Sequence, residues 1–220
     1  GLAAHELAHQ WFGDLLTCKD WSHGWLNESF ATYFDALFQE HDKGRDEFLY
    51  DMLRNLATYM EEDEKHYRRS IVTNKFKQST DMFDRHLYQK GSWVLHMIRM
   101  ELGDETWWKV INHYVKKHMH KSVETLDLIN SIEDVTVKNM KKFFDQWVFS
   151  SGYPHLRVLQ SWDEKKKELL LRITQEQKAG KETPMFSFPL EIELVTNKGR
   201  KEHKENIDKR QHLFKYKLDS

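Results

Sequence analysis

The sequence has little of several features that mark particular classes of protein. Its only cysteine, Cys18, excludes an internal disulfide and the disulfide framework of small secreted domains. No apolar run approaches the roughly 20 residues of a membrane span, and no signal peptide is visible. With 34 Lys and Arg against 35 Asp and Glu, no charge excess favours nucleic acid or an anionic membrane. These absences favour the cytoplasm without fixing the compartment.

The first part of the chain has the periodicity of helices. Apolar residues make up only 39% of the 220 residues, but aromatic residues at 13% add large buried areas, so one large or two small domains can form. Apolar spacing near 3.6 residues predicts helices over residues 2–17, 26–38, 46–60, 86–102, 104–120, 122–135 and 138–149. Residues 67–85 show no clear period and are expected to form a long loop that can line a site.

After residue 150 the period changes to that of strands. Residues 156–162, 168–175 and 186–195 alternate apolar and polar side chains, as half-buried strands do. The charged run at 163–168 is typical of a hairpin turn rather than of a nucleic-acid patch. The sequence therefore predicts an α+β protein with two domains. A helical domain is expected over residues 1–150, and a β-sandwich, whole or incomplete, over residues 151–220.

The stretch HELAHQWFGDLLTCKDWSHGWLNE, residues 5–28, carries candidate metal ligands. His5 and His9 are four residues apart, so on a helix they lie on one face and can bind one ion. In a chain with 13 histidines such a pair can arise by chance. Glu28 lies on the next predicted helix, which would return it over the same face if the two helices pack antiparallel. Two imidazoles and a carboxylate suit zinc and leave a fourth position for water. Glu6 is badly placed to share the ion but can take a proton from that water.

Three segments of the sequence resemble the zinc aminopeptidases, which have an HExxH motif followed by a glutamate after eighteen intervening residues. This family includes the relatives of alanyl and puromycin-sensitive aminopeptidases and of leukotriene A4 hydrolase. The matching segments are HELAHQWFGDLLT with WLNESFATYF, LYQKGSWVLHM at residues 87–97, and GYPHLRV at residues 152–158. The resemblance implies a mostly helical, thermolysin-like catalytic subdomain followed by a small β-sandwich.

The resemblance also implies an activity, the removal of N-terminal residues from peptides that have a free N-terminus. It implies one Zn²⁺ per chain, held by His5, His9 and Glu28, with Glu6 as the base. Tyr88 matches the family tyrosine that stabilises the oxyanion, and Glu28 matches a glutamate that also helps to hold the substrate amine.

Two departures from the family pattern bear on activity. The Gly-x-Met-Glu-Asn motif that recognises the amino terminus is not in this chain, and Ser29 stands where glycine is usual. We therefore expect this chain to be a fragment whose partner is the missing N-terminal part of the same protein. Its peptidase activity when isolated is expected to be absent or very weak. The alternative to an enzyme is a non-catalytic scaffold or interaction protein on the same fold. Such relatives tend to lose metal ligands, whereas this chain retains all three.

Other residues have simpler interpretations. Tyr88 has the alternative of being a core aromatic residue. The acidic run at 61–64 predicts a solvated helix face. Asp81 and Asp84 are expected to be solvated loop carboxylates, with an orienting role toward Tyr88 as the alternative. We expect surface positions for the remaining histidines of the last helices, His113, His118 and His120.

Overall fold

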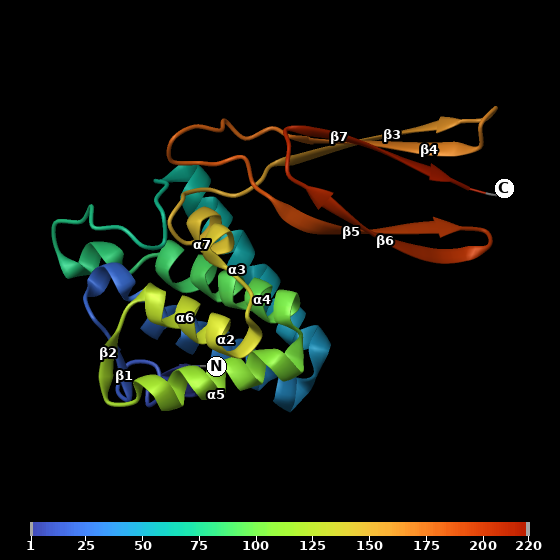
Figure 1. Ribbon diagram of the computed structural model, residues 1–220. Coiled ribbons are helices and arrows are strands. Elements are labelled where there is room, and N and C mark those ends of the chain that lie inside the picture. Colours follow the sequence, from blue (N-terminus) through green and yellow to red (C-terminus); the bar gives the residue numbers. More distant parts are fainter. Residues whose placement is uncertain (1, 219–220) are drawn as a thin grey trace. The chain divides into compact units, whose positions relative to one another are not determined.

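The structure, a computed structural model, describes residues 2–218, and the chain divides into two compact units, Gly1–Ser151 and Gly152–Ser220. The first unit consists mainly of helices, with one short pair of strands, and the second of strands (Figure 1). The mixed α+β fold predicted from the sequence is confirmed. The helices are α1 (Leu2–Ala8), α2 (Trp25–Lys43), α3 (Arg45–Lys65), α4 (Gly91–Leu102), α5 (Asp104–His118), α6 (Thr125–Thr136) and α7 (Lys141–Trp147). Among residues 2–218, no helix is both long and apolar enough to cross a membrane.

Helix α2 forms the centre of the first unit. It packs against α1, α3 and α4, while α5 packs against α4 and α6. Phe30 and Tyr33 of this helix are fully inaccessible to solvent, whereas Phe38 is 48% exposed. Tyr33 packs edge-on against Trp107 of α5, so one large aromatic cluster holds the helices together. Gly44, with φ of 94°, joins α2 to α3 in a backbone conformation that favours glycine.

The first helix is much shorter than predicted. The sequence predicts a helix over residues 2–17, but α1 ends at Ala8. Beyond it the backbone tightens into irregular turns, in which the amide of Asp14 donates to the carbonyl of His9. Gly13 has φ of 150°, which no continuous helix allows. A short strand follows at once.

That strand, β1 (Leu16–Cys18), pairs in parallel with β2 (Lys121–Val123). Neither strand is predicted from the sequence, since three residues are too few to show an alternating pattern. The pairing fixes the segment between α1 and α2 to the segment between α5 and α6. It continues beyond the ladder, because the amide of Lys19 donates to the carbonyl of Val123 at 2.8 Å.

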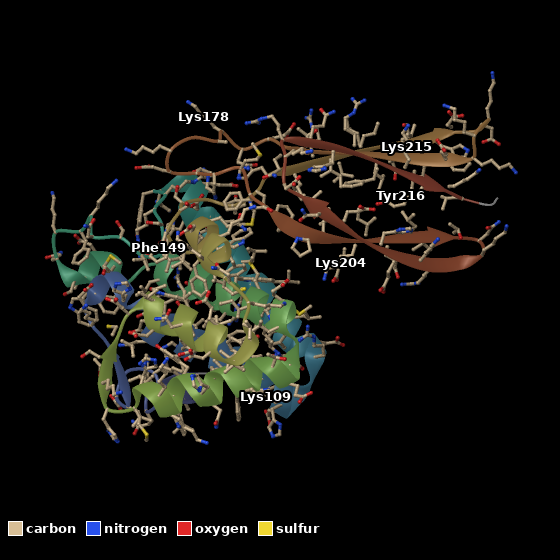
Figure 2. The ribbon with its side chains drawn as sticks, in the orientation of Figure 1. Lys109, Phe149, Lys178, Lys204, Lys215 and Tyr216 are labelled. Carbon is tan, nitrogen blue, oxygen red and sulfur yellow. The ribbon has the colours of Figure 1, made fainter. Side chains whose placement is uncertain are left out.

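The second unit consists of two antiparallel sheets. One sheet has the order β3 (Leu156–Asp163), β4 (Glu168–Gln175), β7 (Gln211–Lys217), and the other pairs β5 (Phe188–Thr196) with β6 (Gly199–Ile207). Leu171, Leu194 and Tyr216 form the buried cluster of this unit. Tyr216 lies between the two sheets (Figure 2), and its hydroxyl donates to Glu205 at 2.9 Å. This is the arrangement of a small sandwich.

Candidate metal centre

The structure brings His5, His9 and Glu28 together at one point between α1 and α2. The Nε2 atoms of His5 and His9 are 3.2 Å apart. The Oε2 atom of Glu28 lies 3.6 Å from Nε2 of His5 and 3.3 Å from Nε2 of His9. Three electron-pair donors that converge this closely repel one another unless they share a cation or a proton. The three side chains are 16 to 21% exposed, so the centre opens to solvent on one side.

The triangle of donor atoms fits a tetrahedral zinc ion. Zinc binds imidazole nitrogen and carboxylate oxygen at about 2.0–2.1 Å, so two ligand atoms at a tetrahedral angle are about 3.3 Å apart. The three measured separations are 3.2, 3.3 and 3.6 Å. The donor set of two imidazoles and one carboxylate is also one that zinc prefers when a fourth position stays open. The residues present therefore fit the ion that the sequence implies.

The turn after α1 sets the orientation of the His9 ring. Its Nδ1 lies 3.0 Å from the backbone carbonyl oxygen of Phe12. A carbonyl only accepts hydrogen bonds, so Nδ1 carries the proton and Nε2 keeps its lone pair for a metal. The irregular backbone after α1 thus places the Phe12 carbonyl beside the His9 ring.

Glu28 is held by the first turn of α2. The helix begins at Trp25, and a carboxylate in its first turn is favoured by the positive end of the helix dipole. The adjacent Asn27 accepts a hydrogen bond from the amide of Cys18 at 3.2 Å, which ties this turn to β1. The indole of Trp25 donates to the Thr125 hydroxyl at 2.9 Å inside the core. Local helix geometry supplies the histidine pair, whereas these long-range contacts supply the third candidate ligand.

Tyr88 lies beside the candidate metal centre, in a π-helical turn labelled η3 (His86–Lys90). Its ring stacks on the ring of His5 with centroids 6.2 Å apart. Burial, followed by the charge of Glu28 and a hydrogen bond with that carboxylate, raises the pKa of Tyr88 above its ordinary value. The charge of Glu6 acts in the same direction. The phenol therefore stays protonated and can donate a hydrogen bond at neutral pH.

A buried carboxylate that the sequence analysis misjudged supports this turn. Asp84 was expected to be solvated, and that prediction is wrong, because the residue is only 8% exposed. Its two oxygens accept from the Arg69 guanidinium at 2.6 and 2.7 Å. The Tyr67 hydroxyl donates at 2.7 Å, and the backbone amide of Leu87 at 2.9 Å. Burial alone would raise the pKa of Asp84, but hydrogen bonds from His86 and Arg69 hold it well below its usual range.

His86 lies at the centre of the same buried network. Its Nε2 is 3.3 Å from Oδ1 of Asp63, and its Nδ1 is 3.3 Å from Oε2 of Glu62 and 3.4 Å from Oδ2 of Asp84. Burial alone would lower the pKa of His86, but the carboxylates of Asp63 and Asp84 raise it. The solvated face predicted for residues 61–64 is wrong for Asp63, which is 5% exposed. An acidic run shows charge but not which of its members faces inward.

The remaining candidates are separate from the metal centre. Asp81 is exposed, as predicted, and accepts from backbone amides of its own loop. His113 lies near the surface, 2.9 Å from Asp134, and His120 is exposed. The surface position predicted for His118 is wrong, because its ring packs on Tyr114 and is 8% exposed. These three histidines provide no ligand to the site.

Comparison with known proteins gives one matching family model. The model described as the peptidase family M1 domain matches residues 1–147. Among curated proteins, Aminopeptidase M1 of Arabidopsis thaliana is 34% identical over 70% of this chain and 18% of its own length. The chain spans about a quarter of the length of the first curated relatives that it matches.

Solved structures similar to this one include those of two other proteins. Aminopeptidase A of Legionella pneumophila, in complex with aspartic acid, has a TM-score of 0.75 at 22% identity, over 98% of this chain and 24% of its own. A mutant M1 zinc metallopeptidase of Deinococcus radiodurans, bound to a Tyr-Ser-Ala substrate, has a TM-score of 0.56 at 27% identity. That match covers 67% of this chain and 32% of the other. The first likeness concerns the fold alone.

Proposed function

The chain belongs to the peptidase family M1, and from this premise we propose that it is the zinc-binding part of an aminopeptidase, a metallopeptidase that removes N-terminal residues from peptides. The observation that carries the proposal is the triangle of His5, His9 and Glu28, whose edges match a tetrahedral zinc site. Residues 1–150 would form part of the catalytic domain and residues 151–220 a β-sandwich domain. One zinc ion per chain is proposed.

The proposed chemistry divides among five side chains. A bound zinc ion would polarise the scissile carbonyl and lower the pKa of a water molecule toward about 7. His5, His9 and Glu28 would hold the ion, and the Phe12 carbonyl keeps the His9 proton on Nδ1. Glu6 lies on α1 between the two histidines and would take the proton of the attacking water on its carboxylate.

Tyr88 and Glu28 would act on the substrate. The protonated Tyr88 hydroxyl would donate a hydrogen bond to the carbonyl oxygen as negative charge develops on it, a contribution typically worth about 100-fold or more in rate. Glu28 would also help to hold the free α-amine of the substrate. The named relatives support peptides as the substrate class, because they are called aminopeptidases and one related enzyme was solved with a tripeptide.

The test is the substitution Glu6→Gln in the complete protein in which this chain occurs. We expect the kcat for an aminoacyl anilide to fall by about 1,000-fold or more, since a general base contributes up to about 10⁴-fold. Zinc measured by mass spectrometry should stay at about one per chain, because Glu6 is not a ligand. Glu61→Gln, an exposed carboxylate on α3, is the matched control and should leave kcat unchanged. Turnover unaffected by Glu6→Gln would contradict the proposal.

The second candidate function is a non-catalytic scaffold on the same fold. A scaffold needs no metal, so purified protein without stoichiometric zinc and without turnover would favour it. The retained triangle of ligands, together with Glu6 and Tyr88, favours the enzyme. We also propose that the 220 residues alone have little activity, because the family's amine-recognition motif is not among them. Robust anilide cleavage by these residues alone would overturn that statement.

A further inference from the structure

A buried serine lies where the two halves of the proposed site meet. Ser29 directly follows the candidate ligand Glu28 on α2 and is fully inaccessible to solvent. Its hydroxyl donates to the backbone carbonyl of Leu87, the residue directly before Tyr88. One side chain therefore joins the segment that carries a proposed metal ligand to the segment that carries the proposed oxyanion donor.

The glycine at the start of α4 provides the space for this serine. A β-carbon at Gly91 would lie 1.8 Å from Oγ and 2.6 Å from Cβ of Ser29. Both distances are far below a van der Waals contact, and Cβ of Ser29 is fixed to the helix backbone. Gly91 has φ of −62° and ψ of −39°, ordinary helical values that any residue adopts. Close packing against Ser29, rather than backbone conformation, thus explains the glycine.

We propose that Ser29 and Gly91 form a clasp that positions Tyr88 against Glu28, an inference that rests on the proposed function. The stacking of Tyr88 on the His5 ring, beside the charge of Glu28, requires α2 and the η3 turn to keep one register. A π-helical turn is a rare departure from regular helix geometry and occurs frequently at functional sites. The Ser29 hydroxyl and the close approach at Gly91 hold that backbone on both sides of Tyr88. Both members of the clasp are positioning residues and do not contact substrate.

The test is an exchange of the two side chains in the complete, zinc-loaded protein. Gly91→Ala alone should push the turn away from α2 and lower kcat by about 100-fold, near the effect of losing one oxyanion donor. The double variant Ser29→Gly with Gly91→Ala moves the small residue to the other side of the contact. It should recover kcat to within about 10-fold of the parent, because the space that the new methyl needs is open again. Zinc content should not change in either variant.

The same substitution in a Tyr88→Phe variant separates an effect on the position of Tyr88 from a general loss of structure. If the clasp acts through Tyr88, Gly91→Ala should change kcat by less than about threefold when Tyr88→Phe is already present. A full additional loss in that background would overturn the proposal, as would a double variant no better than Gly91→Ala. Should Gly91→Ala fail to fold, Ser29→Ala removes only the hydroxyl, and a kcat equal to that of the parent would then count against the clasp.

Thermal unfolding of the parent, Ser29→Gly, Gly91→Ala and the double variant provides a readout that needs no activity. The melting temperature lost with Gly91→Ala should be largely regained in the double variant, because the steric conflict is removed. Additive losses would show that the two residues do not act together. This cycle can be measured even if the parent shows no peptidase activity, so failure of the clasp and failure of the proposed function are distinguishable.

Discussion

Among the described residues of the first unit, two groups of histidine and carboxylate side chains could each surround a metal ion, and they differ in what lies around them. In the first group, His5, His9 and Glu28 point three lone-pair donors at one place that opens to solvent. In the second, His86 is fully buried among carboxylates that include Glu62 and Asp84. Similar residue types at similar distances are therefore not enough to define a metal site.

The two groups differ in whether a positively charged side chain already lies beside the carboxylates. The Arg69 guanidinium lies 2.6 Å from the Asp84 carboxylate, and Nε2 of His86 faces the carboxylate of Asp63. The second group thus already contains the positive charge of the Arg69 guanidinium, and its carboxylates raise the pKa of His86. A divalent ion would have to displace that guanidinium. At the first group, His9 keeps its proton on the side of the Phe12 carbonyl and leaves its lone pair free.

The comparison predicts opposite results when a histidine is removed from each group. His9→Ala should reduce bound zinc from about one per chain to below about 0.1 after dialysis, since losing a ligand lowers affinity by well over 100-fold. His86→Gln should leave the zinc content unchanged. Both variants are measured by mass spectrometry on the folded protein. Loss of zinc with His86→Gln and retention with His9→Ala would reverse the two assignments.

A smaller effect is expected when the second group loses its internal cation. Arg69→Met should lower the free energy of unfolding by about 3–5 kcal/mol, because it leaves Asp84 buried without its partner. The matched control is Lys109→Met, which removes an exposed ion pair with Glu105 and should change stability by less than about 0.5 kcal/mol. Urea titration followed by circular dichroism measures both. If both variants lowered the free energy of unfolding equally, the second group would not stabilise the fold more than an exposed ion pair does.

The two groups also differ in how far the sequence predicts them. His5 and His9 are neighbours through local helix geometry, so four-residue spacing is enough to place them on one face. The proximity of Glu28 needed the packing of a second helix, which the sequence suggested and the structure shows. The catalytic and ligand roles of these residues, and of Glu6 and Tyr88, stay predictions.

The second group could not be predicted, for a physical reason. Arg69 and Asp84 are separated by a segment without periodicity, and the contacts of His86 reach back 23 residues to Asp63. No spacing rule connects such positions. The same limit applies to the early end of α1, which depends on the backbone at Gly13. The helical and strand halves followed from periodicity, because each half buries a regular apolar pattern.

The smallest effect concerns pH and only the second group. The folded-state pKa of His86 is raised above its unfolded value of about 6.5. Its charged form therefore stabilises the fold, fully so below about pH 6.5, and the contribution is lost as pH rises through the folded pKa. The difference in unfolding free energy between the parent and His86→Gln should be greatest near pH 5.5 and shrink as pH rises. A difference independent of pH would contradict a charged His86.

The comparison must use the difference in unfolding free energy between the parent and His86→Gln, because Lys90 also changes stability with pH. Burial lowers the pKa of Lys90 to about 7, well below its unfolded value, so this residue makes stability increase with pH above 7. That trend opposes the one expected from His86 and would hide it in the parent alone. Both proteins contain Lys90, so its contribution cancels in the difference as long as Asp63 and Asp84 stay ionised in both. Measurement with the zinc-loaded protein at each pH keeps the first group constant, and the slope of the difference then reports the proton on His86.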